Sequence, residues 1–90
     1  MPSYLVETYL APGRAGERTA FDRRARSAAA ELTREKTSVR FQYSIYLPVD
    51  DLCFFVFDAP SGPDARAAAQ RAALDPIRVV EAVTSGEADR

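Results

Sequence analysis

The pattern of apolar and polar positions divides the 90-residue chain into six segments with the periods of regular secondary structure. Apolar and polar residues alternate from Tyr4 to Leu10 and, most regularly, from Val39 to Leu47, which predicts two strands. Leu52 to Phe57 is apolar at every position, as in a strand that is covered on both faces. A last strand is predicted from Ile77 to Thr84.

Two segments between these strands have helical periodicity. Glu17 to Lys36 carries apolar residues three and four positions apart, so one stripe of that helix is expected to face the core. Ala65 to Leu74 is rich in alanine; Asp64 is the expected N-cap, and Pro76 ends the segment. The stripe of the first helix consists of Phe21, Ala25, Ala28 and Leu32.

The resulting order, βαββαβ, predicts a ferredoxin-like α+β fold: a four-stranded antiparallel sheet with two helices on one face. Right-handed crossovers place the first and third strands in the middle. Residues 1–84 then form one domain, and residues 85–90 a flexible C-terminal tail. Because two short helices cover only one face, the doubly apolar third strand implies a second cover, either another subunit or a ligand. We therefore expect a homodimer or higher homo-oligomer formed through the open sheet face.

Strict alternation gives the second strand two different faces. It places Tyr43, Ile45 and Leu47 on the side of Phe41, and the more polar residues on the other side. A covered face with polar groups is typical of a pocket lining, although a solvated edge is the alternative. These polar residues are Arg40, Gln42, Ser44 and Tyr46.

Composition excludes several classes of function. Twelve basic and thirteen acidic residues give a net charge of −1, which argues against a nucleic-acid partner. Neither a membrane span nor an export signal is recognisable, and the single cysteine, Cys53, fits a reducing, cytoplasmic compartment. The chain has no histidine, so it cannot form a Ser-His-Asp or Cys-His triad and lacks the commonest metal ligand. We predict neither a metal nor another cofactor.

Three short stretches resemble a family of small actinobacterial ferredoxin-like proteins, mostly of unassigned function, some described as nickel-binding. They are Pro2–Glu7, Val39–Ser44, and Asp58-Ala59-Pro60 followed by an alanine-rich helix. Where the family has a His-Ser pair in its second strand, this chain has Tyr43-Ser44, and alanine stands near Ala68 where a histidine is usual. The resemblance therefore implies the fold but not nickel binding. At the level of fold, the chain is also similar to dimeric polyketide cyclases, cofactor-free monooxygenases and muconolactone isomerase.

Because the chain has no histidine, carboxylates and phenols are the main candidates for proton transfer. Glu7 and Glu81 lie inside the first and last strands, which are neighbours in this fold, so the two carboxylates are candidates for a catalytic pair if they share a face. The alternative is that they lie at a strand edge, in water or paired with Arg78. Glu7 is the stronger candidate because its strand is expected to be central.

Tyrosine and arginine side chains are the next candidates. Tyr43 is a candidate to donate a hydrogen bond to an enolate oxygen, or else a core residue with its hydroxyl at the rim. Cys53 is expected to be an inert core thiol. Arg40 and Arg78 are expected either to lie on the surface or to bind a carboxylate. The predicted catalytic residues are Glu7, Glu81 and Tyr43, and the predicted substrate-binding residues are Tyr9, Arg40, Gln42, Ser44, Tyr46, Phe55 and Arg78.

These observations favour a cofactor-free isomerase or cyclase that acts by proton transfer on a small oxygenated, partly aromatic metabolite in bacterial specialised metabolism. The alternative is a non-catalytic dimeric module that binds a metabolite or a metal.

Overall fold

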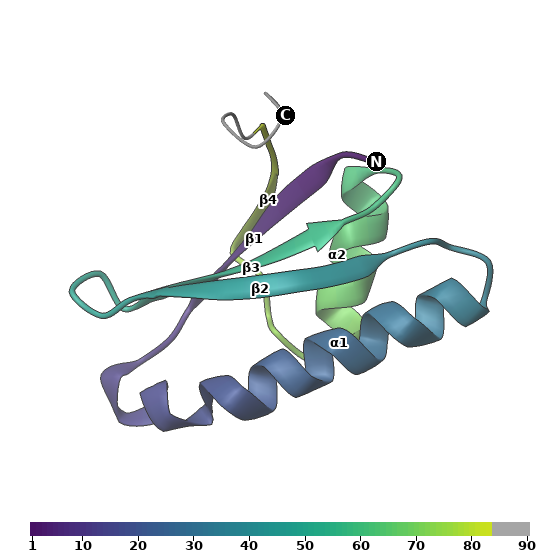
Figure 1. Ribbon diagram of the computed structural model, residues 1–90. Coiled ribbons are helices and arrows are strands. Elements are labelled where there is room, and N and C mark those ends of the chain that lie inside the picture. Colours follow the sequence, from purple (N-terminus) through teal and green to yellow (C-terminus); the bar gives the residue numbers. More distant parts are fainter. Residues whose placement is uncertain (84–90) are drawn as a thin grey trace, which may run out of the picture.

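The computed structural model describes residues 1–83, and the predicted tail at residues 85–90 lies outside them. It has the predicted order of strands and helices, with one additional short 3-10 helix, η1, between the first strand and the first helix (Figure 1). The elements are β1 (Ser3–Tyr9), η1 (Pro12–Glu17), α1 (Arg18–Arg34), β2 (Arg40–Leu47), β3 (Leu52–Asp58), α2 (Gly62–Arg71) and β4 (Arg78–Ala82).

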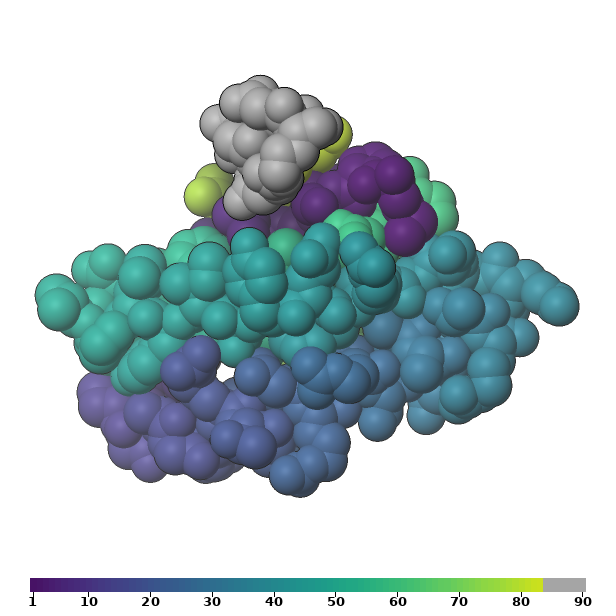
Figure 2. Space-filling model, in the orientation of Figure 1, coloured from purple at the N-terminus to yellow at the C-terminus, as the bar shows by residue number. Residues whose placement is uncertain are grey.

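The four strands form an antiparallel sheet in the order β2-β3-β1-β4, with both helices on the same face (Figure 1). This confirms the ferredoxin-like fold and the central position of β1 and β3. The space-filling view shows the edge strand β2 lying along α1, so this helix covers the β2 side of the sheet (Figure 2). None of the helices in residues 1–83 combines the length and apolarity needed to cross a membrane.

The core lies between the sheet and the helices. Val6 and its neighbours in β3, Cys53 and Phe55, are at most 1% exposed. Phe41 of β2 packs against Phe57 with the two rings tilted by 59° and their centroids 5.5 Å apart. The buried side chains of α2 are all alanines, which lets this helix approach the sheet closely.

A β-bulge in β2 changes which side chains face the helices. The pairing with β3 shifts between Phe41 and Tyr43, so Phe41 pairs with Phe57 but Tyr43 pairs with Val56. One extra residue reverses a two-residue period, so the prediction that Tyr43 shares the face of Phe41 is wrong. Tyr43, Ile45 and Leu47 face away from the helices, and Ser44 and Tyr46 face α1.

The N-terminus of α2 is capped by Ser61 rather than by the predicted Asp64. The Ser61 hydroxyl accepts a hydrogen bond from the Asp64 amide and donates one to the Asp64 carboxylate, at 3.3 and 2.8 Å. This reciprocal pair at the N-cap and N3 positions satisfies an amide that the helix itself leaves unpaired. Asp64 lies in the first turn, where its negative charge interacts favourably with the positive end of the helix dipole.

Both helices end in Schellman motifs closed by residues that are not glycine. After α2, the Leu74 amide donates to the Ala69 carbonyl and the Ala73 amide to the Gln70 carbonyl, both at 3.0 Å. Ala73 has a φ of 59°, and Lys36 occupies the same position after α1 with a φ of 79°. Glycine is the usual residue here because a Cβ is unfavourable in the left-handed region.

We expect the Ala73→Gly substitution to stabilise the protein by about 1 kcal/mol, because Ala73 is exposed and loses no packing when its Cβ is removed. In a domain of this size, that corresponds to a rise in Tm of about 4–8 °C by circular dichroism. The matched control is Ala30→Gly, the same change at an exposed position inside α1, which should destabilise by about 1 kcal/mol. A fall in Tm for Ala73→Gly would contradict the strain argument.

Candidate functional site

The sheet face turned away from the helices, here called the open face, is largely apolar and carries no cover within residues 1–83. Its β2 side chains Tyr43, Ile45 and Leu47 are 51%, 43% and 37% exposed. The register places Phe54 opposite Ile45 and also opposite Glu7 on the other side. The apolar open-face residues are Leu5, Tyr9, Tyr43, Ile45, Leu47, Leu52, Phe54, Val56, Val80 and Ala82.

One ion pair stands in this apolar surface. The Arg78 Nε donates to the Glu7 carboxylate at 2.9 Å, with 16% of the glutamate side chain exposed but 65% of the arginine. Glu7 thus reaches the open face from the central strand β1 as a largely buried carboxylate whose partner is in solvent. For Glu7 the structure thus shows the pairing with Arg78 that was the alternative to a catalytic pair of carboxylates.

Glu81 lies on the opposite face of the sheet from Glu7. In the β1–β4 register, Glu7 is opposite Arg78 and Tyr4 is opposite Glu81. Tyr4 is a core residue on the helix side, so Glu81 shares that side, where it is exposed at the edge of the sheet. The two carboxylates therefore do not form a catalytic pair, which would require that they share a face.

A second polar group on the open face surrounds Asp58 at the end of β3. Its carboxylate accepts hydrogen bonds from Ser3 at 2.7 Å, Gln42 at 2.7 Å and Arg40 at 2.9 Å. Burial raises the pKa of Asp58, but the hydrogen bonds from Ser3, Gln42 and Arg40 together outweigh it and hold the pKa below its ordinary value. Arg40 and Gln42, predicted to bind substrate, thus use their polar groups to hold Asp58, whose importance the sequence reasoning missed.

Three other predicted binding residues lie on the helix side of the sheet: Ser44, Tyr46 and Phe55. Arg18, the first residue of α1, donates to the Ser44 hydroxyl at 3.2 Å and places its guanidinium 5.5 Å from the centre of the Tyr46 ring. Phe55 is 1% exposed in the core. The expectation that the polar side of β2 lines the open face is therefore wrong for Ser44 and Tyr46, because of the bulge.

Cys53 is fully buried beneath the same part of the sheet. Burial raises the pKa of its thiol, and the nearby guanidinium of Arg18 lowers it by less. The inert core thiol predicted from the sequence is confirmed in these respects. Among residues 1–83, no three Asp, Glu or Cys side chains gather closely enough to hold a metal ion.

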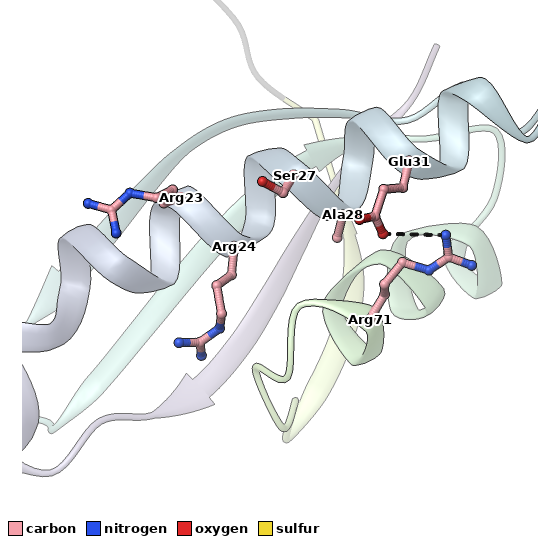
Figure 3. A pocket seen from close by; sticks show the side chains of 6 residues that line it. All are labelled: Arg23, Arg24, Ser27, Ala28, Glu31 and Arg71. Carbon is pink, nitrogen blue, oxygen red and sulfur yellow. Dashed lines mark ion pairs between the residues drawn. The ribbon is translucent and has the colours of Figure 1, made fainter.

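A groove of about 220 Å³ runs between α1 and α2 on the helix layer (Figure 3). Arg71 points across it to Glu31 and also pairs with Glu35, at 3.7 and 2.7 Å. Arg24 extends towards the loop after α2, where it donates to the Ala72 carbonyl at 2.8 Å. These contacts tie the helices together and cap α2, so we assign the groove a structural role.

Comparison with known proteins supports the fold. No family model matches the chain, and no curated protein matches it. The crystal structure of SCO4226 from Streptomyces coelicolor A3(2) is similar to it, with a TM-score of 0.61, over 93% of this chain and 99% of that one. At 11% sequence identity this likeness shows the fold alone. The predicted resemblance to small actinobacterial ferredoxin-like proteins is supported to that extent.

Proposed function

We propose that this protein is a homodimer whose open faces enclose a small oxygenated, partly aromatic molecule, on which Glu7 acts as the proton-transfer group. The observation that carries the proposal is a largely buried carboxylate standing in an exposed apolar sheet face. An apolar surface with a few convergent polar groups is the usual composition of a small-molecule site.

The apolar character of the open face supports its closure by a second copy. Tyr43 and Ile45 are about half exposed, and they continue an apolar surface that runs through Phe54 to Leu5. Contiguous apolar surface of this kind is typical of an interface. A two-fold axis through the sheet would bring the same surface of each copy into contact.

Within such a dimer, Glu7 would accept a proton next to a carbonyl of the substrate. Closure would remove water around the carboxylate and so strengthen its electrostatic interactions with the substrate. Arg78, paired with Glu7 at 2.9 Å, would stabilise the carboxylate beforehand and then the oxygen on which negative charge develops. Tyr43, on the same face, supplies a phenol that can donate to that oxygen.

A non-catalytic binding module is the second candidate, and the separation of Glu7 from Glu81 favours it. Glu7 is already paired with Arg78, and Asp58, the other carboxylate described on this face, is held by three hydrogen bonds, so neither is a free acid that could complete a proton relay. In this case the Glu7–Arg78 pair would anchor the polar end of a ligand, whose ring would lie on Phe54 and Ile45.

The test compares the wild type with Glu7→Gln against a panel of hydroxylated anthrones and unsaturated lactones, followed by absorbance and mass spectrometry. We expect the wild type to convert at least one compound and Glu7→Gln to lose about 100-fold or more in kcat, the size of effect expected for a general base. Circular dichroism should be unchanged, since glutamine still accepts from Arg78.

Glu35→Gln is the matched control, because it makes the same change in a carboxylate on the helix layer. It should retain full turnover. Full turnover by Glu7→Gln would overturn the catalytic proposal, and saturable binding without conversion by the wild type would favour the binding module instead.

A further inference from the structure

We infer a second small-molecule site, distinct from the Glu7 site, in a pocket at the end of the sheet. It has a volume of about 200 Å³ and lies where β1 ends, between the start of α1 and the loop that joins α2 to β4. We propose that it binds a single-ring aromatic acid with a hydrogen-bond donor on the far side of the ring. This proposal does not depend on the function proposed for the open face. The lining residues are Thr8, Tyr9, Arg14, Phe21, Ala73, Leu74, Asp75 and Ile77.

The pocket has the size and the lining expected of a site for one ring. Phe21 and Leu74, both 7% exposed, contribute buried apolar surface, while Tyr9 and Ile77 are 62% and 56% exposed. A ligand that covered Tyr9 and Ile77 would remove apolar surface from water. A cavity of about 150 Å³ lined by apolar side chains is large enough for benzene, so a pocket of this volume suits a single substituted ring.

Arg14 supplies a positive group for a carboxylate. Its guanidinium lies 5.3 Å from the centre of the Phe21 ring, which holds it against the pocket. Glu17 engages two of its nitrogen donors, at 3.3 and 3.0 Å, in a pair whose side chains are 58% and 49% exposed. Solvent screens this exposed pair, and a guanidinium has further donors, so a ligand carboxylate can bind Arg14 beside Glu17.

Asp75 supplies the opposite charge in the same pocket. Within residues 1–83 it forms no ion pair with Arg14, so the two charged groups border the pocket without neutralising each other directly. Its backbone is left-handed, with a φ of 54°. A dipolar ligand complements this arrangement: a carboxylate for Arg14 and a hydroxyl or amine that donates to Asp75.

The pocket and the Glu7 carboxylate are close along the chain but lie on different sides of β1. The Ile77 amide donates to the Glu7 carbonyl at 2.7 Å and so joins β1 to the start of β4. The Glu7 side chain lies on the open face, whereas Thr8, the next residue, faces the helix side and lines the pocket. Tyr9, predicted from the sequence to bind substrate, lies on the open-face side opposite Leu52 and borders this pocket at the end of β1.

The probes are 4-hydroxybenzoate, its methyl ester and unsubstituted benzoate, titrated into ¹⁵N-labelled protein. We expect 4-hydroxybenzoate to shift the amide signals of Thr8, Tyr9 and Ile77 saturably, and to bind about tenfold more tightly than either analogue, since each analogue lacks one charged or polar contact. Equal affinity for the acid and its ester, or shifts confined to other residues, would overturn the inference.

Two variants assign the contacts. Arg14→Gln should abolish the preference for the acid over the ester, and Asp75→Asn should abolish the preference for 4-hydroxybenzoate over benzoate. Asparagine tolerates the left-handed backbone at position 75, so that variant is expected to fold. Arg34→Gln, at the exposed end of α1, is the charge-matched control and should bind all three probes as the wild type does. Preferences unchanged by Arg14→Gln and Asp75→Asn would also refute the site.

Discussion

Replacing Asp58 by alanine should lower the free energy of unfolding by about 3 kcal/mol at pH 7, because it removes a buried carboxylate that accepts three hydrogen bonds. Asp58 joins the ends of three strands: Ser3 comes from β1, and Arg40 and Gln42 come from β2. The loss should appear in urea unfolding as a lower midpoint with an unchanged slope.

The pH dependence distinguishes the charge of Asp58 from its packing. Its hydrogen bonds hold the pKa below the ordinary value of 3.8, despite burial. A depressed pKa means that the stabilisation is fully present above the unfolded-state pKa and is lost as pH falls through the folded-state pKa. The Asp58→Asn variant should therefore differ most from the wild type at neutral pH, and the difference should shrink below about pH 4.

Asp50→Asn is the matched control, since Asp50 is exposed in the turn between β2 and β3. It should change stability by less than about 0.5 kcal/mol at any pH. A constant difference between Asp58→Asn and the wild type from pH 7 to pH 3 would contradict the charge argument.

The strand order and the helix layer could be predicted from the sequence, because they follow from the hydrophobic period and the handedness of crossovers. The doubly apolar stretch Leu52–Phe57 correctly indicated a central strand with apolar side chains on both faces. These features depend on many residues together, so no single local departure alters them.

The bulge in β2 could not be predicted in this way. The alternation from Val39 to Leu47 is regular, and no glycine marks an irregular position. Pairing with β3 creates the bulge, and it moves Tyr43 to the open face and Tyr46 to the helix side. The alternation along β2 alone cannot reveal a one-residue shift in the way β2 pairs with β3.

The candidate site was predicted only in part for a related reason. Glu7 and Arg78 are recognisable as charged residues inside strands, and the structure pairs them. The faces of Glu7 and Glu81, however, depend on the register between β1 and β4, which local periodicity does not determine. Asp58 likewise acquires its three partners only when the ends of β1, β2 and β3 meet.

Replacing Ile45 by lysine should disrupt the proposed dimer and raise its dissociation constant by about 100-fold or more. Ile45 is 43% exposed and lies opposite Phe54, in the middle of the apolar stretch that the edge strand β2 contributes to the open face. A lysine there would bury an ammonium group without a partner, and the two-fold symmetry of a homodimer would repeat that penalty on the second subunit. The monomer should remain folded, because the side chain points away from the core.

The measurement is sedimentation equilibrium over a range of protein concentrations, with circular dichroism to verify folding. Ala30→Lys is the matched control, because it places the same lysine at an exposed position on α1. It should dimerise like the wild type. A wild type that stays monomeric at the highest concentration, or an Ile45→Lys variant that associates as strongly as the control, would exclude the open face as the interface.

The Ile45→Lys variant also tests whether turnover depends on dimerisation. If closure by a second copy creates the environment of Glu7, Ile45→Lys should lose turnover together with dimerisation, although Ile45 donates no proton. It should leave binding of 4-hydroxybenzoate unchanged, because neither Ile45 nor any other β2 residue lines the Arg14–Asp75 pocket. A folded, monomeric Ile45→Lys protein with full turnover would show that each subunit holds a complete site, and the proposed role of the dimer would then be wrong.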